Sequence, residues 1–334
     1  MKVLIDHHTP FQLAHGGLQT QIEQTLHALG AIGIDAECLR WWDESQTGDL
    51  VHFFGRPDAS YIQFAHGKGM KVVMLELLTG LGSRGAAARF VQKSLLTAAQ
   101  AILPRAFTAR LAWDSYQLAD ACIANTVWEA TLMKSIFRAT PKKVHVVPNG
   151  VEAEFLESTP RERGQWLVCS GTITERKRML ELAEAAVLAQ APVRFIGKPY
   201  ANTDPYAERF ANLVKKHPQW LRHEGPINDR SKLAAAYREA RGFILLSTME
   251  TRSLAAEEAS ACECPLLLSD LPWARSVFGS KASYCPITTT AKTAAILRQF
   301  YEAASALPRP ARPVSWVEVA HQFQAIYGQV LHTS

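Results

Sequence analysis

The sequence predicts an α/β protein made of two Rossmann-like domains. Short apolar runs alternate with amphipathic helical patterns in both halves of the 334 residues, as in parallel sheets covered by helices. A chain of this length can bury two cores of ordinary size. A Pro-Asn-Gly turn at 148–150 and a polar stretch at 152–165 interrupt the alternation near its middle. The expected parts are domains at 1–158 and 159–312 and a terminal helix within 313–334.

The composition fits a soluble globular protein, with 48% hydrophobic and 20% charged residues. No apolar run reaches the roughly 18–20 residues that span a bilayer, and the N-terminus has no signal-peptide core. We therefore expect a cytoplasmic location. The six cysteines are scattered among apolar residues, which favours reduced thiols. The net charge of +5 is concentrated in the C-terminal half. It favours an anionic ligand there, and no nucleic-acid motif accompanies it.

In the N-terminal half, an apolar run at 2–6 predicts the first strand, and an amphipathic pattern at 18–29 predicts the first helix. The loop between them carries Gly16 and Gly17. Glycines let a backbone pass close to a ligand where any side chain would clash. The loop lacks the G-x-G-x-x-G pattern of dinucleotide-binding proteins. Further strands are expected at 50–54, 72–75, 121–124 and 144–147.

The alternation restarts in the C-terminal half, and a last helix at 315–331 follows a proline-rich linker. Strands are expected at 166–170, 193–196, 242–246 and 265–268. After the first of them come Arg176, Lys177 and Arg178, just before a helical pattern. Guanidinium and ammonium groups can neutralise a diphosphate through charged hydrogen bonds. A solvated basic helix start is the alternative interpretation.

Two glutamates flank the start of a helix in the segment 241–273. Glu250 ends the loop after the strand at 242–246, and Glu258 follows with seven residues between them. A helix start offers free N–H groups and a positive dipole potential, which suit phosphate. Nearby carboxylates can bind sugar hydroxyls. The combination suggests a sugar nucleotide as ligand, whereas a solvated acidic helix face would show the same spacing.

These motifs resemble retaining glycosyltransferase family 4 in their order along nearly the whole chain. The family's Glu-x7-Glu region matches Glu250 and Glu258, its paired-glycine loop matches Gly16 and Gly17, and its basic cluster after a glycine matches 171–177. The resemblance implies the GT-B architecture, two facing Rossmann-like domains with a cleft between them. It also implies that the last helix crosses back to the first domain.

The resemblance further implies a role for individual residues. Arg176 and Lys177 would stabilise the departing diphosphate, Glu250 would contact the sugar, and these three are the catalytic candidates. Glu258 would bind the ribose hydroxyls. The other expected donor-binding residues are Gly16, Gly17, Gly171, Arg252, Ser253, Leu254, Gly225, Ile227 and Leu233.

The chain departs from the family at three positions. Thr172 stands where an arginine commonly follows the glycine, so Arg176 or Arg178 is expected to take over part of the phosphate contact. Arg252, within Thr-Arg-Ser, stands in place of Gly-Phe-Gly and is expected to reach the phosphate. Glu76 stands where the family places a histidine. Glu76 and His52 are expected on the acceptor side, although a buried strand histidine is the plainer interpretation of His52.

Residues 77–113 contain five basic residues, no Asp or Glu and several interleaved apolar side chains. Such a segment at 84–110 could lie on an anionic membrane surface at the inner face and receive a lipid-linked acceptor. A solvated helix with one face toward the core gives the same pattern.

The resemblance implies a metal-independent retaining glycosyltransferase of polysaccharide biosynthesis that moves a hexosyl group from a nucleoside diphosphate to a glycan or lipid-linked acceptor. No Asp-x-Asp pair occurs in the sequence, so neither a divalent metal nor another cofactor is expected. The alternative is a catalytically silent nucleotide-sugar- or lipid-binding protein of the same fold, and a Rossmann oxidoreductase is a more distant one.

Overall fold

The computed structural model describes residues 1–8, 16–102, 112–157, 162–201 and 203–332. The chain divides into two compact units, Met1–Gly150 with Val314–Ser334 (unit 1) and Val151–Pro313 (unit 2). The boundary therefore precedes the expected position near residue 158. Val151 and Phe155 are buried in the core of unit 2, which explains why the chain changes units directly after the Pro-Asn-Gly turn.

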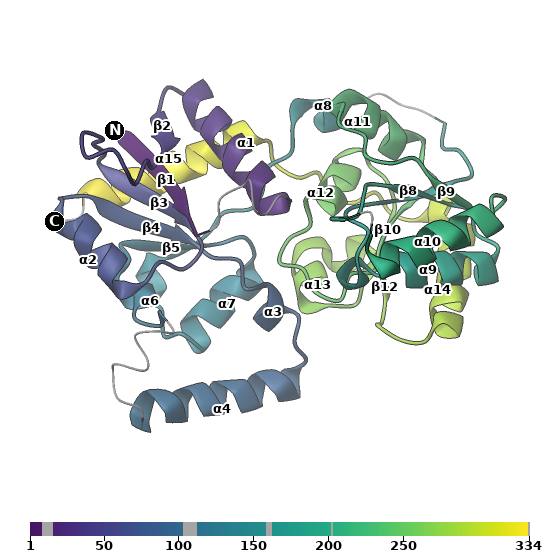
Figure 1. The fold of residues 1–334 in the computed structure, drawn as a ribbon, viewed down its shortest axis with the longest axis horizontal. Helices are drawn as coiled ribbons and strands as arrows, with labels where there is room; N and C mark the ends of the chain where they lie inside the picture. Colours follow the sequence, from purple (N-terminus) through teal and green to yellow (C-terminus); the bar gives the residue numbers. More distant parts are fainter. Residues whose placement is uncertain (9–15, 103–111, 158–161, 202, 333–334) are drawn as a thin grey trace. The chain divides into compact units, whose positions relative to one another are not determined.

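Unit 1 contains a six-stranded parallel sheet in the order β2-β1-β3-β4-β5-β6, which Figure 1 shows from one side. Its central strands are buried along their whole length, because helices cover both faces. The strands are β1 (Lys2–His7), β2 (Asp35–Cys38), β3 (Leu50–Phe54), β4 (Lys71–Leu75), β5 (Ala121–Ala124) and β6 (Val144–Val146).

The helices of unit 1 are amphipathic or short, and several begin at a side-chain cap. Asp58 accepts a hydrogen bond from the N–H of Tyr61 and begins one helix; Thr126 accepts from Glu129 and begins another. The described helices of this unit are α1 (Gly17–Ala31), α2 (Ala59–Gly67), α3 (Thr79–Gly82), α4 (Ala86–Ile102), α6 (Ser115–Leu118), α7 (Val127–Ser135), the 3₁₀ turn η1 (Pro141–Lys143) and α15 (Trp316–His332).

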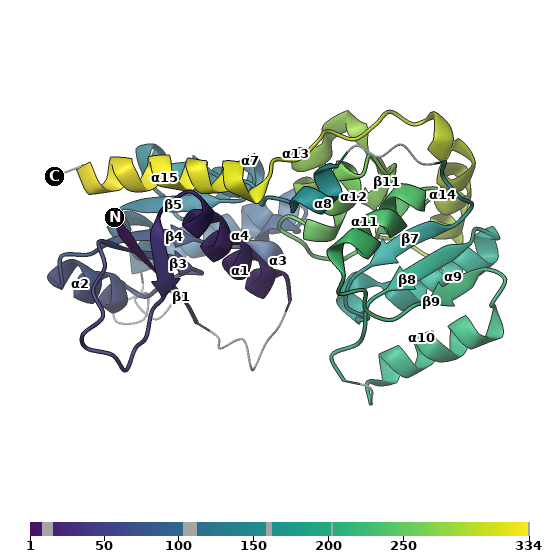
Figure 2. The ribbon, with the colours of Figure 1, turned by 90° about the horizontal axis from the view of Figure 1, so that it is seen from above.

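Helix α15 packs on α1 and β4 although most of the chain separates it from them (Figure 2). Phe323 and Tyr327 on its inner face are buried against the ring of His52 on β3. At its start, a Cβ on Gly150 would lie 2.5 Å from the backbone nitrogen of Trp316, so only glycine allows this approach. The end of the chain is thus an integral part of unit 1.

Unit 2 contains a second six-stranded parallel sheet, in the order β12-β11-β10-β7-β8-β9. Alternate residues of β7 supply the two cores of this unit: Leu167 and Cys169 face one layer of helices, and Val168 faces the other. The strands are β7 (Leu167–Ser170), β8 (Val193–Ile196), β9 (Leu221–His223), β10 (Phe243–Leu245), β11 (Leu266–Ser269) and β12 (Ser283–Cys285).

Helices cover both faces of the second sheet, as expected for a doubly wound fold. One core includes residues of α9, α10 and α14, and the other includes residues of α8, α11, α12 and α13. The helices and 3₁₀ turns are α8 (Ala153–Leu156), η2 (Glu175–Lys177), α9 (Met179–Ala189), α10 (Pro205–Lys216), α11 (Arg230–Glu239), α12 (Leu254–Ala261), α13 (Pro272–Phe278), η3 (Gly279–Lys281), α14 (Thr290–Ala303) and η4 (Ala304–Ala306).

The described helices include none that is both long enough and apolar enough to cross a lipid bilayer.

Candidate functional site

The predicted catalytic residues of unit 2 lie where its strand order reverses. Strands β7 and β10 are neighbours in the sheet but lead into helices on opposite faces. In open α/β sheets, ligands bind beyond the carboxyl ends of the strands at such a switch point. Lys177 belongs to the loop after β7, and Glu250 belongs to the loop after β10. The topology therefore brings together two motifs that the sequence separates.

The two loops are joined through their backbones. The N–H of Thr248 donates to the carbonyl of Arg176 at 2.8 Å. Two glycines shape the neighbouring backbone: Gly171 has φ +150° and Gly197 has φ +141°. A Cβ on Gly197 would lie 2.0 Å from the carbonyl oxygen of Gly171, so no larger residue fits there. The close approach fixes the carboxyl ends of β7 and β8 beside the basic cluster.

Arg176, Lys177 and Glu250 form one ion cluster. Arg176 Nη1 lies 3.1 Å from Glu250 Oε1 and 3.0 Å from the carbonyl oxygen of Met249. The ammonium of Lys177 donates to the same carboxylate oxygen. Burial alone would raise the pKa of Glu250, but the charges of Lys177 and Arg176 outweigh it and hold that pKa below its usual value. The cluster thus presents two cations around one ionised carboxylate.

The other basic candidates contact different partners. Arg178 has a left-handed backbone and donates from Nη2 to the carbonyl of Thr288 at 3.3 Å. Arg252 donates from Nε to Glu257 Oε1 at 2.7 Å. Both contacts hold the guanidinium groups against the protein. Arg176 is therefore the arginine that joins Lys177 in the ion cluster.

Helix α12 begins beside this cluster at Ser253, whose hydroxyl accepts a hydrogen bond from the N–H of Ala256 at 3.3 Å. Leu254 is the first helical residue. Glu257, in the first turn, is 1% exposed and carries the ion pair with Arg252. An acidic residue in the first turn is favoured by the helix dipole. The predicted helix start between Glu250 and Glu258 is present.

Glu258 lies one position further along α12 in a buried polar network. Its Oε2 accepts from the hydroxyl of Tyr237 at 3.2 Å, and its Oε1 accepts from Arg230. Arg230 also lies 2.8 Å from Glu152 Oε1, and the Tyr237 hydroxyl is 2.6 Å from Ser170 Oγ. Burial raises the pKa of Glu258 in spite of the charge of Arg230.

Besides Ser170 at the end of β7, this network contains three residues that the sequence did not indicate: Glu152, Arg230 and Tyr237. Glu152 comes from the stretch after the Pro-Asn-Gly turn, and the other two come from the first and last turns of α11. Their side chains hold the carboxylate of Glu258 in one orientation. No local motif marks them, because Arg230 and Tyr237 belong to the network through their contacts with Glu258, and Glu152 belongs to it through its ion pair with Arg230.

The remaining donor candidates lie around the same edge of unit 2. Gly225 has φ +69°, and its carbonyl accepts from the N–H of Gly197 at 2.9 Å. Leu233 is 6% exposed within α11, and Ile227 packs partly buried against the same core. Gly225 therefore shapes a turn beside β8, whereas Ile227 and Leu233 serve as packing residues.

In unit 1, Gly16 and Gly17 lie at the start of α1. Gly16 has φ +149° and precedes the helix, and Gly17 is its first residue. A Cβ on Gly16 would meet no atom within 4 Å, so backbone conformation and not crowding favours glycine here. Residues 9–15 of the preceding loop lie outside the described part of the chain.

Glu76 follows β4 and is bound by two side chains of unit 1. Arg56 donates to its two carboxylate oxygens, from Nη2 at 2.6 Å and from Nε at 2.9 Å, and Tyr116 donates from its hydroxyl. The guanidinium also stacks 4.5 Å from the ring centre of Phe137. Where the family places a histidine, this chain therefore has an ion pair in a fixed geometry.

A further carboxylate lies beneath the loop that contains Glu76. Glu129, on α7, accepts a hydrogen bond from the N–H of Leu78 at 2.9 Å and another from the hydroxyl of Thr126 at 3.2 Å. Burial raises its pKa to about 7, and the nearby charge of Glu76 adds to that shift. No local pattern in the sequence indicates this group.

The expectation that His52 lies on the acceptor side is wrong. Its side chain is fully buried, and its Nδ1 is hydrogen-bonded to the hydroxyl of Tyr327 at 2.6 Å. The ring stacks on Phe54 and meets the edge of Phe323. Burial lowers its pKa to about 3, so the imidazole is neutral. His52 is a core residue because α15 covers this part of β3.

Within the described ranges, no group of three or more His, Cys, Asp or Glu side chains has the arrangement of a metal site.

Two curated relatives match part of the chain, whereas no family model matches it. The chain is 29% identical over 177 residues to the D-inositol 3-phosphate glycosyltransferase of Jonesia denitrificans. It is 28% identical over 170 residues to D-inositol 3-phosphate glycosyltransferase 1 of Catenulispora acidiphila. Each match covers 45% of this chain and spans well under half of the relative's length, 41% and 40%.

Solved structures match nearly the whole chain at low sequence identity. The sucrose-phosphate synthase of Thermosynechococcus elongatus covers all of both chains, with a TM-score of 0.70 and 17% identity. The Anabaena protein HepE, solved with UDP, covers 98% of this chain and 100% of its own, with a TM-score of 0.65 and 13% identity. The chain therefore has the fold of these structures, with two Rossmann-like units as the sequence predicts, and part of it is similar to two proteins that are named glycosyltransferases.

Proposed function

We propose that this protein is a retaining glycosyltransferase that moves a sugar from a nucleoside diphosphate to a hydroxyl of a glycan or lipid-linked acceptor. The observation that carries the proposal is the ion cluster at the switch point of unit 2. Lys177 and Arg176 converge there on the carboxylate of Glu250, beside the start of α12. The relatives named as glycosyltransferases and the UDP bound to HepE support the same ligand class.

In the proposed reaction, the bond between the anomeric carbon and the diphosphate oxygen breaks, and its electron pair leaves with the diphosphate. The oxygen of the acceptor hydroxyl forms the new bond to the anomeric carbon on the same face of the sugar, and its proton passes to the departing diphosphate. Lys177 and Arg176 stabilise the charge that develops on that group. Glu250 holds both cations in position before the donor arrives and contacts the transferred sugar. Glu258, fixed by Arg230 and Tyr237, accepts hydrogen bonds from the ribose hydroxyls. A divalent metal and other cofactors are not required, because the cations of the protein neutralise the leaving group.

The experiment that tests this proposal measures the release of nucleoside diphosphate by the purified protein. UDP-, GDP-, ADP- and dTDP-sugars are supplied with and without an excess of chelator, and UDP sugars are tried first because HepE binds UDP. We expect one donor class to be hydrolysed slowly or transferred, at a rate that the chelator leaves unchanged. Tight nucleotide binding without turnover would favour the catalytically silent alternative. Activity restored only by magnesium or manganese would contradict the role of the basic cluster.

We also propose that unit 1 contacts an anionic membrane surface through α4. Phe90, Leu95 and Ile102 on this helix are 72%, 65% and 79% exposed. Residues 77–113 carry no acidic side chain. Exposed apolar side chains and basic residues on one helix favour an anionic interface. The rest of the predicted segment, at 103–110, lies outside the described residues.

A further inference from the structure

Two adjacent tryptophans of unit 1 are displayed to solvent in the loop after β2. Trp41 is 84% exposed and Trp42 is 67% exposed. Their rings lie perpendicular to each other, with centroids 5.5 Å apart. Tryptophan is usually largely buried, so an exposed pair has no role in the core of the unit. Exposed apolar groups in such an arrangement indicate a recognition surface.

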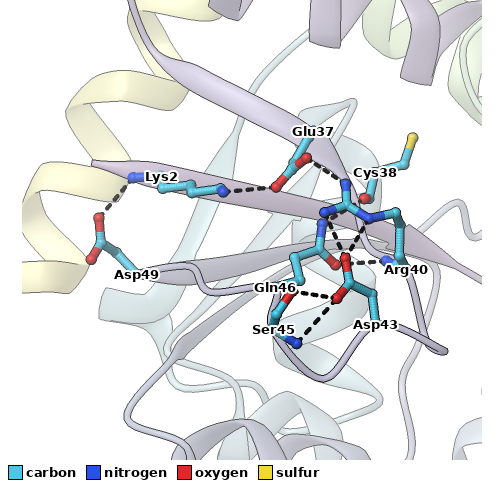
Figure 3. Close-up of polar contacts among 8 residues, drawn as sticks. All are labelled: Lys2, Glu37, Cys38, Arg40, Asp43, Ser45, Gln46 and Asp49. Carbon is cyan, nitrogen blue, oxygen red and sulfur yellow. Dashed lines mark hydrogen bonds and ion pairs between the residues drawn. The ribbon is translucent and has the colours of Figure 1, made fainter.

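The loop that carries the pair is held by its own polar contacts and does not depend on the indole rings. The N–H of Asp43 donates to the carbonyl of Arg40 at 3.0 Å and closes a turn with the two tryptophans at its centre. Figure 3 shows how Arg40 and Gln46 brace this turn. Arg40 Nη1 lies 2.6 Å from Glu37 Oε2, and the N–H of Arg40 donates to Gln46 Oε1 at 2.7 Å.

The central positions of a turn usually hold Gly, Pro, Asn, Asp or Ser, which satisfy its backbone geometry. Trp41 and Trp42 occupy these positions without contributing to the geometry of the turn or to the core. A braced turn presents both rings at little cost in conformational entropy on binding. The arrangement is therefore suited to ligand recognition.

The size and charge of the surface favour a neutral saccharide as occupant. Two tryptophans offer at most about 500 Å² of aromatic surface, less than the roughly 800 Å² that each partner buries in a stable protein interface. Residues 35–49 include five acidic residues and one arginine, and Lys2 adds a further cation beside them through its ion pair with Glu37. Acidic groups still outnumber basic ones, so an anionic membrane or nucleic acid would be repelled. The negative face of an indole ring attracts the C–H groups of a sugar ring, and carboxylates accept hydrogen bonds from its hydroxyls.

The position of the turn connects it to the expected acceptor side. Strand β2 is parallel to β1, and the N–H of Leu39 continues the ladder by donating to the carbonyl of Ile5 at 2.8 Å. The turn therefore leaves the sheet at its carboxyl edge, as do the loops that carry Gly16 and Glu76. Strands β2 and β4 are three strand spacings apart, about 14 Å, a distance that a short oligosaccharide spans.

We propose that Trp41 and Trp42 form an acceptor subsite that stacks on neutral sugar rings remote from the reacting hydroxyl. This inference rests on the proposed function, because it makes the acceptor of that reaction an oligosaccharide. The pair contributes affinity for longer acceptors and takes no part in the chemical step. It also discriminates against acceptors too short to reach from the β4 loop to the β2 edge.

The test monitors the indole N–H signals of the ¹⁵N-labelled protein during titration with neutral gluco-, manno- and galacto-oligosaccharides of two to six residues. No donor is present, so the result does not depend on nucleotide binding or turnover. The Trp41 and Trp42 signals are assigned with Trp41→Phe and Trp42→Phe. We expect a longer member of at least one series to shift both signals, and Trp41→Ala/Trp42→Ala to weaken its binding at least tenfold.

The matched control is Phe64→Ala, which removes an aromatic side chain that is 76% exposed on α2 of the same unit. This variant should bind the oligosaccharide normally. Unchanged Trp41 and Trp42 signals with every saccharide would overturn the proposal. A response to neutral vesicles or to polylysine, and to no saccharide, would assign the pair to a membrane or a basic protein instead. UDP binding and donor hydrolysis by the double variant, measured separately, should equal those of the wild type.

Discussion

The ammonium of Lys177 and the carboxylate of Glu250 are counter-ions in a largely buried pair, with 12% and 11% of the two side chains exposed. Arg176 shares the same carboxylate oxygen. Removal of one partner of a buried pair leaves an uncompensated charge. The two residues therefore depend on each other in the ligand-free protein, which makes their effects on donor turnover non-additive.

We expect Lys177→Ala to lower turnover more than donor affinity, because charge builds on the diphosphate only as the glycosidic bond breaks. The loss should be on the order of 2.7–4 kcal/mol in activation free energy, by analogy with removal of one preorganised donor to a developing anion. Steady-state kinetics with the identified donor measure it. Arg176→Ala should behave similarly.

Lys216→Ala provides the control for the Lys177 variant, since Lys216 is an exposed lysine at the end of α10 in the same unit. Its kinetics should equal those of the wild type. If Lys177→Ala had normal turnover and a raised Michaelis constant, the role of the ion cluster would be limited to donor binding. Combined with Glu250→Gln, the double variant should lose less than the sum of the single losses.

Glu258→Gln should weaken binding of the free nucleoside diphosphate. Replacement of a charged acceptor by a neutral one affects its hydrogen bonds to the ribose, each worth about 1.5–3 kcal/mol at most. Calorimetric titration measures the change. Glu184→Gln, at an exposed position of α9 in the same unit, is the control and should leave nucleotide affinity unchanged. Equal affinities of Glu258→Gln and wild type would remove Glu258 from the site.

The stability of unit 1 should fall in acid because of His52. Its pKa is about 3 in the folded protein, whereas an unfolded histidine titrates near 6.5. Between these values the unfolded state binds more protons, so the free energy of unfolding falls as the pH falls. The slope from this group is about 1.4 kcal/mol per pH unit within that window. Denaturant unfolding at several pH values, followed by a probe in unit 1, measures it.

His52→Gln keeps a polar partner for the Tyr327 hydroxyl and does not titrate. As the pH falls from 7 to 4, the wild type should lose unfolding free energy through His52, whereas the variant should not. The difference in unfolding free energy between the two proteins should therefore become smaller. Parallel pH profiles of the two proteins would show that folding leaves the pKa of His52 unchanged, contrary to the lowered pKa.

Gly197→Ala should destabilise unit 2 by a few kcal/mol, because its Cβ would meet the carbonyl of Gly171 and its φ is positive. Gly30→Ala in α1 is the control, since a Cβ there meets no atom within 4 Å. That substitution should be neutral or stabilise the protein by about 0.5–1 kcal/mol. The melting temperatures of Gly197→Ala, Gly30→Ala and wild type, measured by thermal unfolding, test this prediction. Equal melting temperatures would indicate that the β7–β8 edge relaxes freely.

Helix α4 should bind anionic vesicles and release them at high salt, because each basic residue near the surface adds roughly 1 kcal/mol. Phe90→Ser should weaken vesicle binding in a flotation assay. The control Phe64→Ser, at an exposed position of α2, should leave vesicle binding unchanged. Equal partitioning of the wild type to neutral and anionic vesicles would leave α4 as an ordinary surface helix.

The sequence predicted the central strands of both sheets and missed three edge strands. The missed strands β2, β9 and β12 read Asp-Ala-Glu-Cys, Leu-Arg-His and Ser-Tyr-Cys, without the apolar runs of the strands between them. An apolar run reflects burial on both faces of a sheet, and these short strands retain partly exposed residues. Their pairing depends on neighbours that are distant in the sequence.

The candidate site was predictable where one local motif carries its chemistry. Arg176 with Lys177, and Glu250 with Glu258, stand in recognisable segments, and the fold brings Lys177 and Glu250 into contact. Arg230 was not predictable, because its role depends on a contact between two helices. Its guanidinium extends from α11 to the carboxylate of Glu258 on α12. His52 was misplaced for a related reason: the residue that covers it, Tyr327, lies 275 positions later.

The route of the chain through the two units sets an order for their synthesis. Unit 2 is one continuous stretch, Val151–Pro313, so all its strands have been synthesised before α15 is made. Unit 1 cannot complete its fold until α15 (Trp316–His332) has been made, because β3 and α1 are incompletely covered without this helix. During that interval His52 lacks its hydrogen bond to Tyr327. Unit 1, whose strands are translated before those of unit 2, is therefore the later of the two units to finish folding, and a nascent chain stalled before α15 would expose the apolar surface that chaperones bind.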